Sequence, residues 1–360
     1  MLKAGCLIFL WCCCGLARAQ SLQPGFDKVE YLELIKISSR QVDSGVTSSI
    51  PAPQHSVFIY RSPVVGLDNR WDLWMMNKTT AVLSIRGTTI SSISWLANFY
   101  AAMVPAQGRL SLHSGSYFPY RLADNPRAAV HIGWLVATAA LVADIRPQLD
   151  SLLRNNIRDI AIIGHSQGGA IAYLLTAYLY QLRREGQLPA DTRIKTYCSA
   201  APKPGNLYFA YDYEAMTQAG WAYNVVNSAD WVPETPISVQ TLDDFNTTNP
   251  FVNARAMARK QKFPNNLALR YAINRMDKPT RRAQRQYQRF LGNYAARMVR
   301  KHLKEYTAPA YVRSSNYVRT GAMIVLKADS AYYRRFPDDP EKVFIHHFFG
   351  PYLYLTEKQL

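Results

Sequence analysis

The chain has 360 residues, of which 48% are hydrophobic and 19% are charged. This composition is typical of a folded globular protein and excludes a largely disordered one, and the length allows one large domain or two small ones. The formal net charge is +17, but residues 251–306 alone hold fifteen lysines and arginines against two acidic residues, a net +13. The basic character therefore belongs to one segment.

The first nineteen residues predict a secretory signal peptide. A basic start at Lys3 precedes an apolar run over 7–16 that is too short to span a bilayer, and the pattern Ala-Arg-Ala at 17–19 suits cleavage before Gln20. An uncleaved anchor is the weaker alternative. Four of the five cysteines lie in this segment, so the mature chain keeps Cys198 and is expected to have no intramolecular disulfide. We expect an exported protein that is periplasmic, extracellular or on the cell surface.

Strand-like and helix-like patterns alternate along most of the remaining chain. Three early strands are expected to form an antiparallel meander that leads into a central strand, and the later alternation is typical of a mostly parallel sheet with helices on both faces. The glycine-, proline- and tyrosine-containing region 104–128 is expected to be a loop. The predicted strands are 57–60, 71–76, 81–85, 157–163, 194–201, 222–226, 318–328 and 343–345, and the predicted helices are 25–41, 91–103, 130–154, 170–182, 207–218 and a short one from 348 onward.

The basic segment 251–306 interrupts this alternation. It contains few β-branched residues, which predicts a helical insertion divided at Pro264 and Pro279. A plain solvated surface and attraction to an anionic membrane surface are equally weighted interpretations of its charge. No nucleic-acid partner is expected, because the charge comes without a recognisable binding motif and the chain is exported. The predicted organisation is a signal peptide (1–19) and a single domain (20–360) that carries this insertion.

A serine in the pattern Gly-x-Ser-x-Gly stands between a buried strand and a helix. In Gly164-His165-Ser166-Gln167-Gly168, the glycines are needed because the tight strand-to-helix turn brings other backbone close to them on both sides. Such a turn lifts the serine hydroxyl out of the sheet, and the first N–H groups of the new helix point towards it. The pattern therefore predicts a nucleophile elbow.

Four motifs in order make this chain resemble the class 3 lipase family, which includes fungal triacylglycerol lipases, bacterial lipases and feruloyl esterases. The resemblance covers 81–236, and Trp134 and Gln167 are conservative departures from the commonest family forms. It implies an α/β-hydrolase-like fold that needs no metal or organic cofactor. The matching residues are Arg86-Gly87-Thr88, Val130-His131-x-Gly133-Trp134, Gly164-His165-Ser166-Gln167-Gly168-Gly169-Ala170 and Asp230-x-Val232-Pro233, with Pro202-x-x-Gly205-Asn206 as an additional match.

A serine hydroxyl is a weak nucleophile, so Ser166 needs a histidine base that a carboxylate orients. In this fold the acid and then the histidine follow the serine along the chain. Asp230 comes just after a predicted strand and aligns with the family's catalytic aspartate, whereas no strand leads directly into Asp243 or Asp244. Asp230 is therefore the predicted acid.

Three histidines follow Asp230 in the chain. His302 lies among cations of the basic insertion, with no strand end nearby, so His346 and His347 remain, both after the strand predicted at 343–345. Adjacent residues that leave a strand point in different directions, so only one can face the serine. We favour His347, which is closer to the following helix and resembles the family's histidine, and keep His346 as the alternative base.

The tetrahedral intermediate of acyl transfer also needs hydrogen-bond donors for its oxyanion. One is expected from the backbone N–H of Gln167, directly after the nucleophile. The other is expected from Thr88, after the central strand, as in its family counterpart. His131 is expected to pack or hydrogen bond and not to act in the chemistry, and the aromatic residues Trp95, Phe99, Tyr117, Phe118 and Tyr120 are candidates either for an acyl pocket or for ordinary core.

The sequence thus predicts a secreted serine ester hydrolase, a lipase that acts on lipid acyl esters through a Ser166–His347–Asp230 triad and an acyl-enzyme. The alternative is a catalytically silent protein on a hydrolase scaffold that binds an envelope or membrane surface through 251–306. Transfer of the acyl group to an alcohol other than water is a narrower third hypothesis.

Overall fold

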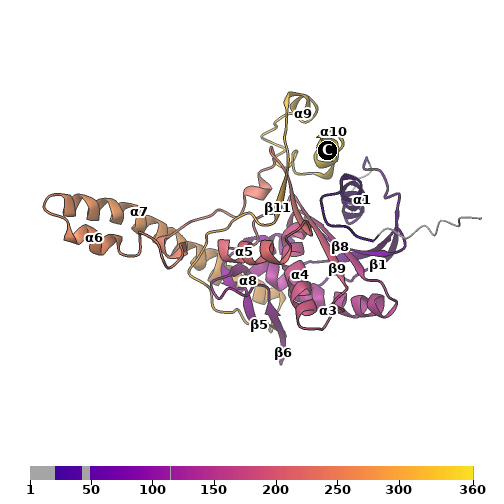
Figure 1. The fold of residues 1–360 in the computed structure, drawn as a ribbon, viewed down its shortest axis with the longest axis horizontal. Coiled ribbons are helices and arrows are strands. Elements are labelled where there is room, and N and C mark those ends of the chain that lie inside the picture. The colour runs from indigo at the N-terminus through magenta and orange to yellow at the C-terminus, as the bar shows by residue number, and fades with distance from the viewer. Residues whose placement is uncertain (1–20, 43–48, 114, 360) are drawn as a thin grey trace, which may run out of the picture.

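A seven-stranded sheet forms the centre of the structure, a computed structural model that describes residues 21–42, 49–113 and 115–359 (Figure 1). Its strands are β1 (Ser56–Arg61), β2 (Trp71–Met76), β3 (Thr80–Ile85), β8 (Asp159–His165), β9 (Arg193–Ser199), β10 (Ala222–Asn227) and β11 (Ala322–Leu326), in the order β1-β2-β3-β8-β9-β10-β11. The first three strands pair antiparallel, which confirms the predicted meander, and the pairs from β3 through β11 are parallel. The predicted signal peptide lies outside the described residues.

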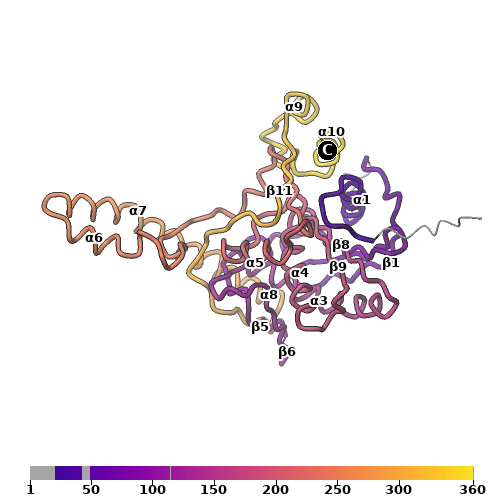
Figure 2. Tube along the Cα trace, viewed as in Figure 1, coloured from indigo at the N-terminus to yellow at the C-terminus, as the bar shows by residue number. Residues whose placement is uncertain are grey.

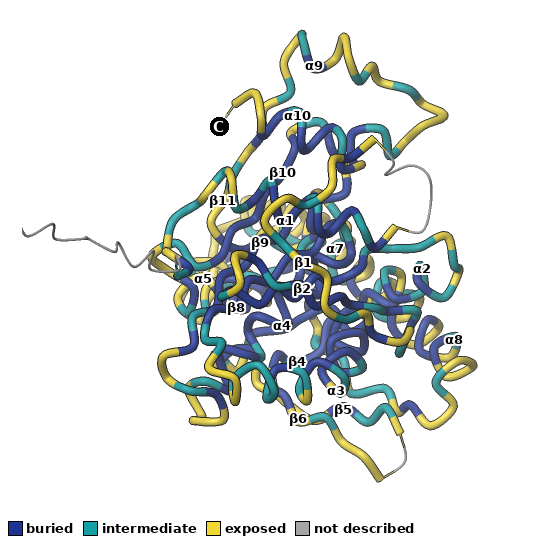
Figure 3. The backbone as a smooth tube through the Cα atoms, turned by 90° about the vertical axis from the view of Figure 1, so that its right-hand side faces the viewer, coloured by how far each residue is buried: buried dark blue, intermediate teal, exposed yellow. Residues whose placement is uncertain are grey.

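Helices cover both faces of this sheet. The α-helices of the described residues are α1 (Lys28–Ser39), α2 (Ser92–Phe99), α3 (Ile132–Arg154), α4 (Gln167–Arg184), α5 (Leu207–Met216), α6 (Ala254–Lys260), α7 (Asn265–Gln288), α8 (Ala295–His302), α9 (Ser330–Arg335) and α10 (Phe349–Gln359). The central strands are buried, and exposed backbone is concentrated in the outer loops (Figure 3).

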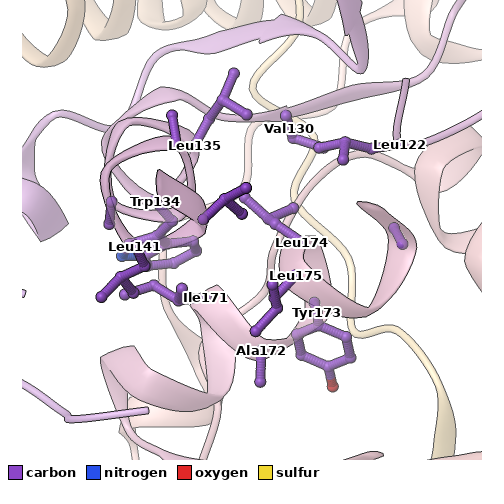
Figure 4. Packing of buried hydrophobic residues seen from close by; sticks show 14 of the residues in the cluster. Leu122, Val130, Trp134, Leu135, Leu141, Ile171, Ala172, Tyr173, Leu174 and Leu175 are labelled. Carbon is purple, nitrogen blue, oxygen red and sulfur yellow. The ribbon is translucent and has the colours of Figure 1, made fainter. Parts of the chain in front are cut away.

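Successive residues of the central strands face two different cores, because side chains alternate between the faces of a sheet. Leu83 and Ile162 belong to the core shared with α3 and α4, part of which is shown in Figure 4. Their neighbours Val82 and Ile163 belong to the core shared with α1 and α10. Both faces are thus covered by helices, and the predicted α/β-hydrolase-like architecture is confirmed.

The expectation of a loop over 104–128 is wrong. β4 (Met103–Pro105) pairs with β7 (Ala129–His131), and β5 (Gln107–His113) and β6 (Ser116–Arg121) form a hairpin. Glycine and proline weaken the strand signal here, but Leu110 is fully buried in the core under α3 and α4. Packing against the helices therefore decides the conformation.

The strand predicted over 343–345 is also wrong. These residues form turns, in which the N–H of Ile345 donates to the oxygen of Lys342 over 2.8 Å and that of His347 to the oxygen of Phe344 over 2.9 Å. A run of three apolar residues does not distinguish a strand from a partly exposed turn. The two candidate histidines therefore follow a turn and precede α10.

The basic segment is helical, as predicted, and α6 and α7 form a hairpin that projects from the body (Figures 1 and 2). Pro264 stands at the turn before α7, but the predicted break at Pro279 is wrong, because this residue lies inside α7. Asp277 and Arg281 form an ion pair of 2.9 Å across the proline, one helical turn apart, and so support the helix there. A π-helical segment, Arg289–Tyr294, joins α7 to α8. The division into one domain with an insertion stays a prediction.

Gly133, in the first turn of α3, allows α2 to pack closely. A Cβ atom added there would lie 2.0 Å from the backbone oxygen of Ala97 and 3.0 Å from that of Tyr100. We expect Gly133→Ala to lower the free energy of unfolding by about 1–3 kcal/mol, as overpacking does. Gly350→Ala is the matched control, since nothing lies within 4 Å of its added Cβ. Urea denaturation followed by circular dichroism measures both, and equal effects would contradict the steric explanation.

Candidate active site

Ser166 stands at the sharp turn from β8 into α4. Its φ of 62° lies in the left-handed region, which non-glycine residues seldom adopt and which tight functional turns retain. A Cβ atom on Gly164 would lie 2.1 Å from the oxygen of Gly168, and one on Gly168 would lie 2.2 Å from the oxygen of Ile85. The glycines are therefore required by close backbone approach, and the predicted strand–turn–helix geometry is present.

Asp230 and His347 lie in direct contact, although 117 residues separate them in the chain. Asp230 comes shortly after β10, and His347 shortly before α10. The distance between Asp230 Oδ2 and His347 Nδ1 is 2.8 Å, and both residues are buried. Two further donors reach the carboxylate: the Tyr352 hydroxyl to Oδ2 over 2.8 Å and the backbone N–H of Val232 to Oδ1 over 3.0 Å.

The charge state of this pair follows from its surroundings. Burial tends to raise the pKa of Asp230, but the electrostatic interaction with the His347 ring and the hydrogen bonds from His347, Val232 and Tyr352 outweigh burial, so the pKa is lowered. An ionised carboxylate only accepts hydrogen bonds, so Nδ1 of His347 carries the proton. Nε2 of His347 is buried and has no hydrogen-bond partner within the described ranges. In the neutral imidazole, a proton on Nδ1 leaves the lone pair on Nε2, and this atom is then the one that could accept a proton.

His346 is engaged elsewhere through both of its ring nitrogens. Nδ1 lies 2.8 Å from the hydroxyl of Tyr332, on α9, and Nε2 lies 2.9 Å from Oδ1 of Asp338. Its backbone oxygen accepts from the Asn227 side chain over 3.0 Å. The two adjacent histidines thus serve different neighbours, and only His347 is joined to Asp230.

The other candidates named from the sequence lie apart from this pair. Asp243 is paired with Arg281 of α7, and Asp244 caps a short helical turn with Thr241. His302 is exposed at the end of α8, and His131 is buried at the start of α3, where it accepts from the N–H of Trp134. Across the described residues, no group of three or more His, Cys, Asp or Glu side chains is placed to hold a metal ion.

His165, inside the elbow, holds the loop of His347 in place. Its Nε2 lies 2.6 Å from the backbone oxygen of His347, and because a carbonyl only accepts, Nε2 must be protonated. Nδ1 then accepts from the hydroxyl of Ser199 over 3.0 Å, and Ser199 accepts from the hydroxyl of Tyr31 over 2.8 Å. Burial lowers the pKa of His165 to about 3, so it remains neutral and its hydrogen bonds persist. Nothing in the sequence of the elbow signals this role of His165.

Thr88 and Gln167, the two predicted oxyanion donors, are tied together by Asn98 of α2. The Asn98 side chain donates to Oγ1 of Thr88 over 2.9 Å and accepts from Nε2 of Gln167 over 2.8 Å. With its oxygen already accepting, the Thr88 hydroxyl has its hydrogen left to donate. The N–H of Gln167 belongs to the first turn of α4, where helix N–H groups have no partner within the helix. No motif in the sequence marks Asn98 as part of the site.

A second polar contact fixes the loop that carries Thr88. Arg86, just after β3, donates to Oδ1 of Asp68 over 2.9 Å. The hydroxyl of Thr89, which follows Thr88 in the chain, donates to Oδ2 of the same carboxylate over 2.5 Å. Asp68 lies in the turn between β1 and β2 and also has a positive φ, 63°. One carboxylate thus holds both flanks of Thr88, and the sequence offered no signal for it.

The aromatic candidates separate into two groups. Trp95 and Phe99 stack at 6.0 Å on α2, and Trp95 lies 6.1 Å from Phe344, whose ring is 5.9 Å from that of His347. Phe99 is 57% exposed, so this group is an apolar surface beside the buried histidine. Tyr117, Phe118 and Tyr120 belong instead to the β5–β6 hairpin, where Phe118 packs on Tyr178 of α4.

Comparison with known proteins assigns the region around this site to a family. Residues 82–240 match the sequence model of the lipase (class 3) family, which confirms the resemblance. A secreted mono- and diacylglycerol lipase of Malassezia globosa is 36% identical over 115 residues, which are 31% of this chain and 35% of that protein. A secreted mono- and diacylglycerol lipase of Fusarium solani is 30% identical over 156 residues, 43% of this chain and 39% of that protein.

The chain thus spans less than half the length of the curated relatives it matches. Among solved structures, the Lip2 lipase of Yarrowia lipolytica aligns with a TM-score of 0.44 and 20% identity, covering 60% of this chain and 77% of that one. A fungal lipase in complex with an inhibitor aligns with a TM-score of 0.44 and 21% identity, covering 58% of this chain and 74% of that one.

The lowered pKa of Asp230 predicts how its contribution to stability depends on pH. A carboxyl group with a depressed folded pKa stabilises the fold fully above its unfolded pKa, and this contribution is lost as the pH falls through the folded pKa. We expect Asp230→Asn to lower the free energy of unfolding by about 1–3 kcal/mol at neutral pH. The difference from wild type should shrink below the ordinary value of 3.8, where the protonated carboxyl resembles the amide. Guanidinium titrations across this range measure it, and a difference that grows on acidification would contradict the assignment.

Proposed function

Because residues 82–240 match the sequence model of the class 3 lipase family, we propose that this protein is an exported serine hydrolase that cleaves the acyl esters of lipids. The observation that carries the proposal is the state of His347. Its Nδ1 is held by the ionised Asp230, while its buried Nε2 has no partner within the described part of the chain. A neutral imidazole in this state is the base that an elbow serine requires.

In the proposed reaction, Oγ of Ser166 attacks the acyl carbonyl carbon and its proton passes to Nε2 of His347. The carboxylate of Asp230 stabilises the resulting imidazolium. The oxyanion receives hydrogen bonds from the N–H of Gln167 and from Thr88. The side chain of Asn98 bonds to both of these residues and so positions them relative to each other. The imidazolium then protonates the departing alcohol, and an acyl-enzyme on Ser166 remains.

Hydrolysis of the acyl-enzyme reverses these roles. His347 takes a proton from water, the hydroxide attacks the acyl carbon, and the second tetrahedral intermediate uses the same two donors. The proton returns to Oγ of Ser166 as the fatty acid leaves. Every proton in the cycle is carried by His347, and no cofactor takes part.

Two observations support a lipid as the substrate. The curated relatives are named mono- and diacylglycerol lipases, and the apolar side chains Trp95, Phe99 and Phe344 stand beside His347. An apolar surface next to a buried polar centre suits an ester with a long acyl chain. Both relatives are also named as secreted, which agrees with the predicted signal peptide and supports an exported enzyme.

Replacement of the serine tests the proposal directly. Ser166→Ala should lower kcat/KM for short- and long-chain p-nitrophenyl esters by at least about a thousandfold, because the nucleophile is lost while binding groups remain. Unchanged circular dichroism would show that the fold is intact. Equal turnover by the two proteins would reject the serine mechanism and favour the catalytically silent surface-binding protein.

The two adjacent histidines provide a matched pair of variants. His347→Ala should lower kcat about as far as Ser166→Ala does, and the double variant should fall no further, because residues that act as one unit are not additive. His346→Ala should retain most of kcat and instead lose stability through its bonds to Tyr332 and Asp338. Steady-state kinetics and thermal unfolding separate these effects. A larger loss of kcat at His346 would reverse the assignment.

A further inference from the structure

The hairpin of α6 and α7, here called the arm (254–288), is the most strongly charged part of the described structure. It projects away from the sheet and its covering helices (Figures 1 and 2). Its sequence holds ten lysines and arginines and one acidic residue, Asp277. Asp277 is buried, and it is paired with Arg281 over 2.9 Å and with Arg255. The one carboxylate is thus used within the arm, and a large excess of positive charge faces solvent.

Apolar side chains are exposed at the end of the arm, among these cations. Phe263, in the turn between the two helices, is 78% exposed, and Leu267 and Tyr271 follow on α7 at 53% and 66% exposure. Residues four apart lie on one side of a helix. Arg275 continues this side, with its guanidinium 5.7 Å from the centre of the Tyr271 ring. The arm therefore has an apolar tip that passes into a cationic stem.

The base of the arm is fixed to the body beside the candidate active site. In the π-helical segment, the oxygen of Leu291 accepts from the N–H of Ala102 over 2.9 Å. A Cβ atom on Gly292 would lie 2.9 Å from the Cβ of Ala102 and 2.9 Å from the ring of Tyr311, so only glycine allows this approach. α8, which continues the π-helical segment, packs on α2, the helix that carries Asn98. The arm is therefore anchored next to the helix that orders the predicted oxyanion donors.

We propose that the arm docks the protein onto bilayers that carry anionic phospholipid. Its cations would lie at the headgroup phosphates, while Phe263 and Leu267 enter the interface between headgroups and acyl chains. No helix in the described ranges is long and apolar enough to cross a membrane. In the proposed binding mode the arm rests on the bilayer surface. This role concerns binding and does not depend on ester hydrolysis.

The apolar residues distinguish a lipid surface from a nucleic acid as the partner. Nucleic acids bind cationic side chains through their phosphates and aromatic side chains through base stacking, but exposed aliphatic side chains contribute little to such binding. Leu267 and Met276 are 53% and 67% exposed on α7, the helix that also carries Arg270, Arg275 and Lys278. Exposed aliphatic groups among the cations of a surface helix suit the interface of an anionic bilayer.

Vesicle sedimentation tests the proposal, with the full chain carrying Ser166→Ala so that no lipid is consumed. The triple variant Arg259→Gln/Lys260→Gln/Lys262→Gln removes exposed cations near the tip, and Lys78→Gln/Arg109→Gln/Arg334→Gln removes as many exposed cations elsewhere. On vesicles of phosphatidylcholine mixed with an equal amount of phosphatidylglycerol, the arm variant should bind about a hundredfold more weakly than its parent. The affinity of the control variant for these vesicles should fall much less, and that of Phe263→Ser should fall about tenfold.

Each other outcome overturns the proposal. Equal binding to pure phosphatidylcholine would remove the electrostatic basis, and equal losses in the arm and control variants would attribute binding to net charge alone. Binding to duplex DNA without binding to vesicles would identify a nucleic acid as the partner.

Turnover of a soluble short-chain ester, measured with Ser166 restored, is the second measurement. The arm variant should hydrolyse this ester at the same rate as its parent, since none of its three substitutions lies in the candidate active site. Vesicle binding without any ester turnover would reject the proposed function and leave the docking role in place. Ester turnover without vesicle binding would reject the docking role alone.

Discussion

The close packing of α4 against β3 and β8 is the constraint on which the candidate active site depends. It is possible only because Gly164 and Gly168 have no side chains, since an added Cβ would come within about 2.2 Å of another backbone oxygen. The same packing forces Ser166 into the left-handed region and sets the first N–H groups of α4 beside the end of β3. Steric constraints on the backbone therefore place the serine and both predicted oxyanion donors together at the C-terminal ends of the central strands β3 and β8.

Buried hydrogen bonds then bring the C-terminal part of the chain to these strand ends. Asp230 accepts from both His347 and Tyr352, and His165 donates to the backbone of His347. Because an unpaired polar group is costly to bury, each of these partners constrains the others. The chain of bonds continues through Ser199 to Tyr31 on α1, so the N-terminal helix takes part in positioning the histidine loop.

The arm contrasts with this densely packed body. Apart from Asp277, Gln284 and Ala258, its side chains are half-buried or exposed, and its helices project away from the sheet (Figure 1). Its helices are held by their own packing and by the ion pairs of Asp277, and its base by the close contact at Gly292. Such an element contributes little to the core, which is why we connect its charge and exposed apolar groups with binding.

Periodicity and local motifs in the sequence were sufficient for the central strands, the covering helices and the elbow around Ser166, because these depend on residues close together in the chain. They failed where packing decided the conformation, as in the hairpin over 107–121 and the turn over 343–345. The sequence also named Asp230 and left two histidines. It gave no sign of Asp68 or Asn98, which act through bonds to distant residues.

The choice between His346 and His347 shows the same limit. The sequence favoured His347 only through its place nearer the following helix and its resemblance to the family's histidine, and the strand expected before the two residues does not exist. Tertiary structure separates them, since Tyr332 and Asp338 occupy both nitrogens of His346, and Asp230 binds one nitrogen of His347 and leaves the other available. The sequence by itself determined the strand–turn–helix at Ser166, because local sterics require its glycines. Only the tertiary structure decided which histidine joins Asp230, because that depends on contacts between segments more than one hundred residues apart.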